Sequence, residues 1–172
     1  MLTIGPDGLE ELLQLLQQRC KASHLTIATA ESCTGGLLSA LLSHRSGSSS
    51  FFLGGVVAYA NSIKTGILAV PELELQTYGA VSLEVASSMA RGVGRLFQSQ
   101  LSCAITGIAG PGGDTPSKPL GFVCFAWTSP QGTISRSRQF FGNREDIRAQ
   151  SCRYGLETLL EITQTFYPEG LS

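Results

Sequence analysis

The stretch Leu25-Thr26-Ile27-Ala28-Thr29-Ala30-Glu31-Ser32-Cys33-Thr34-Gly35-Gly36-Leu37-Leu38-Ser39-Ala40-Leu41-Leu42 decides the fold of this chain. Its β-branched start predicts a buried strand over 25–29, and its leucine-rich end predicts a helix over 37–42. The residues between them, 30–36, then form a sharp strand-to-helix turn that contains two glycines. Such a turn lies at the carboxyl end of a strand, where open α/β sheets bind their ligands.

The same turn carries three side chains with hydroxyl or thiol groups, Ser32, Cys33 and Thr34. Backbone N–H groups at a helix N-terminus attract an anion or a developing oxyanion, and a serine becomes a nucleophile when a base lies within reach. The alternative is an ordinary turn in which Ser32 only caps the helix. The turn matches neither the Walker A pattern nor GxGxxG, so the other segments have to decide.

The pattern in the remaining sequence predicts strands that alternate with helices and end in a hairpin. We expect helices over 7–21 and 61–68, from Ser82 to Leu96 and after a cap at Asn143, and strands over 51–59, 101–108, 121–128 and 133–141. Pro71 is expected to end the helix at 61–68. This order predicts a single three-layer α/β/α domain with a mixed, mainly parallel sheet, spanning 1–172 with its core over about 8–165 and a frayed tail after Tyr167.

Composition excludes several classes of function. Charged residues make up only 15% of the 172 residues, and the net charge is -1, which argues against a general nucleic-acid or membrane-surface binder. No apolar run approaches the roughly 18 residues of a membrane span, and the N-terminus lacks a basic signal segment. We therefore expect no direct nucleic-acid or membrane partner, and the low charge content and apolar helices predict a homo-oligomer. The scattered cysteines favour a reducing, cytoplasmic compartment.

The five cysteines are scattered and form no CxxC pair, which argues against a disulfide framework or a zinc site. Four of them are expected to be small core residues. Cys33 is the exception, because a helix N-terminus lowers a thiol pKa and makes it a rival nucleophile to Ser32. The histidines, His24 and His44, are not in a metal-binding spacing, so we expect neither a metal nor another cofactor.

A candidate base follows the second predicted strand, in Tyr59-Ala60-Asn61-Ser62-Ile63-Lys64. A lysine near an apolar sheet end is suited to this role because desolvation lowers its pKa toward neutrality. Tyr59 is positioned in sequence to orient or relay a proton. The alternative places Lys64 on a solvated helix face and Tyr59 in the core.

A glycine-rich segment follows the third predicted strand, in Thr106-Gly107-Ile108-Ala109-Gly110-Pro111-Gly112-Gly113-Asp114. Four glycines within seven residues let backbone N–H groups approach a phosphate or carbonyl closely. The alternative is a flexible surface loop.

Two arginines, Arg144 and Arg148, lie four residues apart at the start of the last predicted helix and therefore share a face. Cations at a helix start oppose the helix dipole, so their presence favours a role in binding an anion such as a phosphate. The alternative is pairing within the helix with Glu145 and Asp146.

Six blocks of sequence occur in an order that resembles one known family. They are Ala30-Glu31-Ser32-Cys33-Thr34-Gly35-Gly36, Tyr59-x-Asn61-xx-Lys64, Gly79-Ala80-Val81-Ser82, Thr106-Gly107-Ile108-Ala109-Gly110-Pro111, Lys118-Pro119-Leu120-Gly121 and Phe141-Gly142-Asn143-Arg144. Together they resemble the CinA C-terminal domain family, the nicotinamide-nucleotide amidases, over about residues 8–165. Each block is weak alone, whereas six in sequence are specific.

The resemblance implies an α/β/α fold and hydrolysis of the amide of nicotinamide mononucleotide to nicotinate mononucleotide and ammonia. It implies that Ser32 is the nucleophile and Lys64 its general base, with Tyr59 assisting. It further implies a substrate site in which Arg144 anchors the phosphate, the turn amides form an oxyanion or phosphate cradle, and further residues line the pocket: Thr34, Gly35, Gly36, Asn61, Thr106, Gly107, Ala109 and Gly110.

The sequence departs from the family pattern at positions that bear on the site, and two other functions compete with hydrolysis. Asp114 stands where the family commonly continues its glycine run, and Asn143 replaces a frequent aspartate, which affects loop closure or the orientation of Arg144. Many relatives also carry an additional N-terminal domain. The competing functions are a non-catalytic module that binds a mononucleotide or phosphate and an interaction domain in DNA uptake or repair. A pure binding module needs neither Lys64 nor Tyr59.

Overall fold

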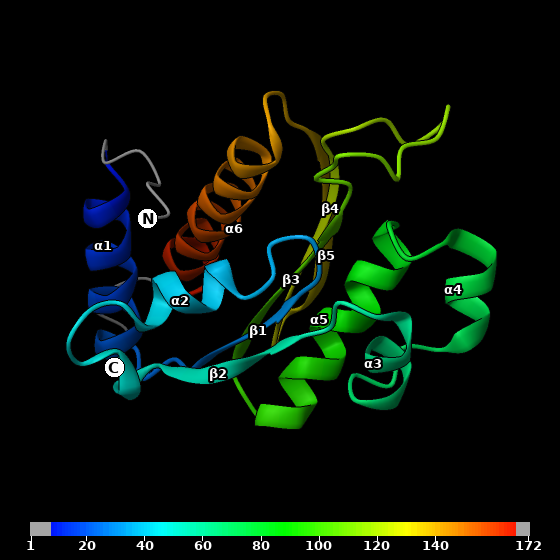
Figure 1. The fold of residues 1–172 in the computed structure, drawn as a ribbon. Helices are drawn as coiled ribbons and strands as arrows, with labels where there is room; N and C mark the ends of the chain where they lie inside the picture. The colour runs from blue at the N-terminus through cyan, green and yellow to red at the C-terminus, as the bar shows by residue number, and fades with distance from the viewer. Residues whose placement is uncertain (1–7, 168–172) are drawn as a thin grey trace.

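A five-stranded mixed sheet lies between two layers of helices in the computed structural model, which describes residues 8–167 (Figure 1). The strand order is β2-β1-β3-β4-β5, with β1 at Ile27–Glu31, β2 at Phe52–Val57, β3 at Leu101–Gly107, β4 at Phe122–Ser129 and β5 at Gly132–Gln139. Strand β1 pairs parallel with both β2 and β3, while β4 pairs antiparallel with β3 and β5. The predicted α/β/α domain with a mixed sheet is therefore confirmed, and β4 alone among the five strands runs against the others.

The helices divide between the two faces of the sheet. One face is covered by α1 (Leu9–Ala22), α2 (Leu37–Ser43) and α6 (Arg144–Phe166), and the other by α3 (Asn61–Gly66), α4 (Glu72–Tyr78) and α5 (Leu83–Phe97) (Figure 1). The strands present bulky residues to the first layer and small ones to the second, since side chains alternate along a strand. The small residues in the cluster with α5 are Ala28, Ala30, Ala104, Cys124 and Ala126. They allow α5 to pack close to the sheet.

The structure corrects two predicted boundaries. Strand β1 reaches Glu31, so Ala30 and Glu31 belong to the strand and the turn is shorter than expected. Pro71 does not end the preceding helix, which already stops at Gly66, but caps the start of α4. None of the residues of α4 is buried, so it carries no apolar periodicity by which the sequence could reveal it. The predicted frayed tail after Tyr167 lies outside the described residues.

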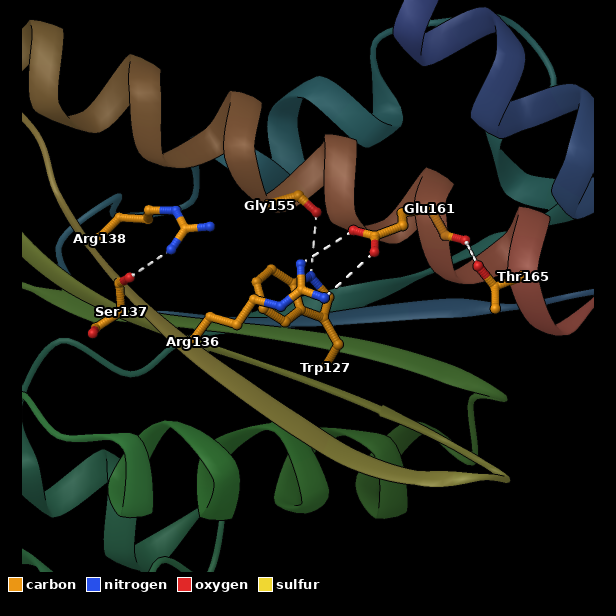
Figure 2. A network of polar contacts seen from close by, with 7 residues as sticks. All are labelled: Trp127, Arg136, Ser137, Arg138, Gly155, Glu161 and Thr165. Carbon is orange, nitrogen blue, oxygen red and sulfur yellow. Dashed lines mark hydrogen bonds and ion pairs between the residues drawn. The ribbon is translucent and has the colours of Figure 1, made fainter.

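Helix α6 is held against the hairpin of β4 and β5 by polar contacts (Figure 2). The Trp127 indole donates to the carbonyl of Gly155 at 3.2 Å, and Arg136 forms an ion pair with Glu161 at 3.1 Å. The Arg136 pair is partly exposed and therefore contributes at most about 1 kcal/mol, so the buried Trp127 contact is the more important one. These contacts fix the helix whose first turn reaches the candidate site.

The start of α6 has the cap that the sequence predicts. The side chain of Asn143 accepts hydrogen bonds from the amides of Glu145 and Asp146, and the Asp146 carboxylate accepts one from the Asn143 amide. This capping box satisfies donors that would otherwise lack partners at the helix start. Asn143 therefore caps α6 with its own side chain, at a position where the family that the sequence resembles frequently has aspartate.

Candidate active site

Ser32 lies where the carboxyl ends of β1, β2 and β3 meet. Its amide donates to the carbonyl of Ile105 at 2.9 Å, and the carbonyl of Glu31 accepts from the Ala58 amide at 2.7 Å. Neighbouring residues at the end of a strand point to opposite faces of the sheet. Accordingly, the Glu31 side chain contacts α2 on one face, whereas the Ser32 side chain meets Lys64 from α3 on the other.

Lys64 is the base candidate, and the structure buries it against Ser32. Only 1% of Lys64 is exposed, and its Nζ lies 3.1 Å from Ser32 Oγ, 2.7 Å from the Ala58 carbonyl and 3.3 Å from the Tyr59 carbonyl. Burial lowers the pKa of the Lys64 ammonium below its ordinary value of 10.5. The Lys64 Nζ donates to all three oxygens, and in its neutral form the amine would keep the two carbonyls as acceptors while its lone pair accepts from the serine hydroxyl. The alternative of a solvated Lys64 is wrong.

Tyr59 links this pair to Arg144. Its carbonyl accepts from Lys64, while its hydroxyl lies 3.4 Å from an Nη of Arg144. The side chain is 62% exposed, so the alternative of a core tyrosine is wrong. Within residues 8–167 the hydroxyl contacts neither Ser32 nor Lys64, so Tyr59 reaches the pair through its backbone.

The backbone amides of the turn donate to other acceptors than the sequence suggested. The Gly35 amide donates to the Ser32 carbonyl and the Gly36 amide to the Glu31 carboxylate, each at 3.1 Å. The expectation that the amides of Gly35 and Gly36 form the anion cradle is therefore wrong. The Thr34 amide has no hydrogen-bond acceptor among the described residues, and the Cys33 amide donates to its own thiol. The alternative of Ser32 as the helix cap is also wrong, because Gly36 precedes the first residue of α2.

Cys33 is buried and poorly suited to act as the nucleophile. It is 7% exposed, and burial raises the pKa of its thiol to about 12. All five cysteines are buried and carry free thiols, which agrees with the core role predicted for the other four. The thiolate, which is the reactive form, is scarce at neutral pH at such a site.

The glycine-rich segment divides into a structural part and a part beside the site. The Thr106 hydroxyl donates to the carbonyl of Ala80 at 2.8 Å, and Gly107 pairs with Val123 in the sheet. A Cβ on Gly107 would lie 2.9 Å from the Val123 Cα, so close strand packing explains this glycine. Ala109 is buried, and the carbonyl of Gly110 accepts a hydrogen bond from Arg144.

Two further residues that the sequence analysis singles out are exposed in the structure. Asn61 is an exposed residue at the start of α3, and Asp114 is exposed within the loop that follows Gly110. In the described residues, neither side chain forms a hydrogen bond or ion pair that joins it to Ser32 or Lys64.

Arg144 and Arg148 both reach the site from the first turns of α6. Arg144 donates to Gly110, and Arg148 donates to the Thr34 carbonyl at 2.7 Å. Over residues 8–167 neither arginine forms an ion pair, so the alternative of pairing with Glu145 and Asp146 is wrong. The Nε of Arg148 and the Thr34 hydroxyl are buried without a hydrogen-bond partner in the same part of the chain. Two arginines without an ion pair among the described residues, and two buried polar atoms without a partner next to the Ser32 turn, favour a polar, anionic ligand.

Sequence reasoning missed two features of the site. Arg148 shares the Arg144 face, and the i, i+4 spacing favours anion binding by both, but the predicted substrate site includes only Arg144. The sequence predicts Glu31 as a turn residue, whereas it ends β1, and the alternation of side chains along that strand directs its carboxylate to α2. The described residues hold no group of three or more His, Cys, Asp or Glu side chains positioned for a metal ion, and no helix among them is long and apolar enough to cross a membrane.

The fold and the site together define an α/β/α protein with a serine–lysine pair at the carboxyl ends of its parallel strands. The chain belongs to the CinA C-terminal domain family, since the family model of that description matches residues 9–163. A CinA-like protein from Mycolicibacterium gilvum is 50% identical over 135 residues, covering 78% of this chain and 32% of the relative. One from Desulfotalea psychrophila is 44% identical over 150 residues, covering 87% and 36%. This chain thus spans about a third of the length of these relatives.

Solved structures agree with the fold over nearly the whole chain. The competence/damage inducible protein CihA from Agrobacterium tumefaciens matches with a TM-score of 0.90 and 36% identity, covering 92% of this chain and 98% of that one. A CinA superfamily protein from Enterobacter cloacae matches with a TM-score of 0.87 and 34% identity, covering 90% and 92%. The names of these proteins state a family, and the name of the Agrobacterium protein adds that it is competence/damage inducible; none of them names a reaction.

Proposed function

We propose that this protein is an amide hydrolase, a nicotinamide-nucleotide amidase that converts nicotinamide mononucleotide to nicotinate mononucleotide and ammonia. The observation that carries the proposal is the contact of 3.1 Å between Ser32 Oγ and the Nζ of a lysine that is only 1% exposed. A buried lysine that has no carboxylate partner within residues 8–167 is a poor structural residue, because burial disfavours its charge. As a neutral amine beside a serine hydroxyl, it is a general base.

The reaction follows from this pair in two balanced steps. Ser32 Oγ attacks the carboxamide carbon while its proton passes to Lys64, and the proton then moves to the departing nitrogen, which leaves as ammonia. The product of this step is an ester between Ser32 and the nicotinoyl group. Water, deprotonated by the same amine, then cleaves the ester, releases the carboxylate and restores the serine.

Two further groups support the chemistry. The amides of Cys33 and Thr34 follow the nucleophile directly, and neither donates to a carbonyl or a carboxylate among the described residues, which suits them to the oxygen of the tetrahedral intermediate. The amide of the residue after a nucleophile is a common donor for such an oxyanion. Arg144 and Arg148 are suited to the phosphate of the mononucleotide, since arginine binds phosphate through paired N–H groups.

The test is release of ammonia from nicotinamide mononucleotide by the purified protein. We expect Ser32→Ala and Lys64→Met each to lower kcat by about 10³-fold or more. Lys21→Met is the matched control, because Lys21 is an exposed residue of α1 and leaves the site unchanged. Full activity in Ser32→Ala would contradict the mechanism. Binding of the mononucleotide without ammonia release would favour the non-catalytic binding module instead.

A further inference from the structure

We propose that Glu31 is a positioning residue whose carboxylate holds the start of α2, so that Ser32 and the amides of Cys33 and Thr34 keep a reactive arrangement. This inference rests on the proposed amidase function, because it concerns the same serine. Glu31 itself does not contact Lys64 in the described residues and lies on the opposite face of the strand end.

The contacts of Glu31 are those of a built-in anion at a helix N-terminus. Glu31 is fully buried, and its carboxylate accepts from the amides of Gly36 at 3.1 Å, Leu38 at 3.0 Å and Ser39 at 2.8 Å. The Ser39 hydroxyl adds a fourth donor at 2.6 Å. All four partners are donors, which matches the acceptor-only form of a carboxylate, and its charge is favourable at the positive end of the helix dipole. A buried charge without these donors would be strongly unfavourable.

This arrangement determines which amides a ligand can use. Glu31 takes the amides of Gly36, Leu38 and Ser39, and the Thr34 carbonyl takes that of Leu37, so these amides at the start of α2 are not available to an incoming anion. The amides of Cys33 and Thr34 remain for it. Glu31 and Ser32 also share a peptide bond. A rotation of the Glu31 backbone therefore moves the Ser32 hydroxyl relative to Lys64, and the four hydrogen bonds of the carboxylate oppose that rotation.

The carboxylate also affects the choice between the two neighbouring nucleophiles. A helix N-terminus ordinarily favours a thiolate, and Cys33 lies close to the start of α2. Here Glu31 already satisfies the donors of that terminus. Burial, with the negative charge of Glu31 adding to it, holds the pKa of the Cys33 thiol high. Glu31 thus helps to keep serine, and not cysteine, as the reactive side chain of the turn.

The experiment measures how fast phenylmethylsulfonyl fluoride labels Ser32, with peptide mapping to assign the site. In this reaction Ser32 Oγ bonds to sulfur, fluoride leaves, and the serine proton passes to Lys64, so the rate reports the positioning of the pair without requiring the natural substrate. The variants are Glu31→Gln, which replaces one acceptor oxygen by a donor group, and Ser39→Ala, which removes one of the four hydrogen bonds together with the 2.8 Å contact between the Ser39 and Thr29 hydroxyls. The matched control is Ser43→Ala in the same helix, whose hydroxyl contacts only backbone carbonyls of α2.

We expect Glu31→Gln to slow labelling about 100-fold, which is typical of a small misplacement of reacting groups, and Ser39→Ala to slow it several-fold. Ser43→Ala should label at the wild-type rate. If kcat for nicotinamide mononucleotide falls in step with labelling while KM stays within about threefold, the residue acts on positioning and not on substrate binding.

Labelling at the wild-type rate in both Glu31→Gln and Ser39→Ala would overturn the inference, as would a wild-type protein whose Ser32 does not react. If near-ultraviolet circular dichroism shows that Glu31→Gln does not fold, Ser39→Ala decides the question. A wild-type protein that labels at Ser32 but releases no ammonia would refute the proposed amidase, and the rates of the variants would still support or refute the role of Glu31.

Discussion

Lys64 shows how a single residue can oppose the stability of the fold and still serve the site. Removing an ammonium from water is unfavourable, and three oxygens without a carboxylate offset that cost only in part. Burial therefore lowers the Lys64 pKa and makes the neutral amine accessible nearer to neutral pH. Burial of Lys64 thus destabilises the fold and, because it lowers the pKa, also supplies the base.

We predict that this shift is visible in both activity and stability. Because only neutral Lys64 accepts a proton, kcat/KM should rise with pH to a plateau, with an apparent pKa below 10.5. Between the folded and unfolded pKa values the unfolded chain binds more protons, so the free energy of unfolding should rise with pH in that window. Lys64→Met should flatten this rise in urea titrations at several pH values, whereas Lys21→Met should keep it. An unchanged slope in Lys64→Met would contradict the shift.

A second residue-scale prediction concerns Cys33. Since burial raises its pKa to about 12 and leaves it 7% exposed, Cys33 should resist iodoacetamide at pH 7–8 in the folded protein and react only after unfolding. Cys33→Ser should keep amidase activity within about threefold, because the role proposed for this residue belongs to its backbone amide. Mass spectrometry of the alkylated protein measures the first outcome. Rapid alkylation that abolishes activity would instead favour the thiol as nucleophile.

Helix α5 illustrates, at the scale of elements, how close packing constrains a sequence. A Cβ on Gly92 would overlap the backbone carbonyl of Leu68, while one on Gly94 would lie 3.4 Å from the Ser102 hydroxyl. Both glycines lie within α5, but only Gly92 is buried against the segment that precedes α4. The contact holds together the layer that carries Lys64.

We predict opposite effects for the two alanine substitutions in α5. Gly92→Ala should destabilise the protein by about 1–3 kcal/mol through overpacking. Gly94→Ala should be neutral or stabilising by up to about 1 kcal/mol, because alanine favours the helix. Urea denaturation measures both, and equal effects would show that the backbone of Leu68 yields to the added methyl group.

The capping box of α6 gives a second prediction at this scale. Asn143→Ala should lower the free energy of unfolding by about 1 kcal/mol, because two amides at the helix start lose their acceptor. Asn143→Asp should keep both stability and activity, since aspartate caps as well as asparagine. Loss of activity in Asn143→Asp with unchanged stability would indicate that Asn143 itself contacts the substrate.

On the scale of the whole molecule, the two edges of the sheet differ in how they are protected. Strand β5 carries Arg136 and Arg138, and charge on an edge discourages pairing with another chain. Strand β2, Phe52-Leu53-Gly54-Gly55-Val56-Val57, has no charge or proline, and its Leu53 and Val57 are 42% and 46% exposed. This contrast favours a second copy of the chain along β2.

We therefore predict a homo-oligomer, in which light scattering after size exclusion gives a multiple of the 18.2 kDa chain mass. Leu53→Lys should shift the protein toward the monomer, because it places a charge on the exposed edge. Ile134→Lys is the control and should leave the mass unchanged, because Ile134 lies on β5 and is 38% exposed, close to the 42% of Leu53. A wild-type mass of one chain at all concentrations would exclude the oligomer.

Local pattern was sufficient for most elements of the fold and for the main pair of the site. The predicted cap at Ser82 is observed, with its hydroxyl accepting from the Val85 amide at 3.2 Å, and so is the box at Asn143. Helix α4 was missed because it buries no residue and so leaves no periodic signal. The amides of Gly35 and Gly36 were assigned to a ligand because nothing in the sequence shows that Glu31 reaches them first.

The sequence by itself determined the layered α/β/α class, because the local spacing of apolar residues distinguishes strands from helices and shows that they alternate. It also placed Ser32 directly after the first strand, Lys64 after the second strand and the two arginines at the start of the last helix. Only the tertiary structure decided that Lys64 is buried against Ser32, that Tyr59 faces Arg144 and that Glu31 occupies the start of α2. These facts depend on contacts between residues far apart in the chain, and on which donors remain unpaired after packing, and both are properties of the folded molecule.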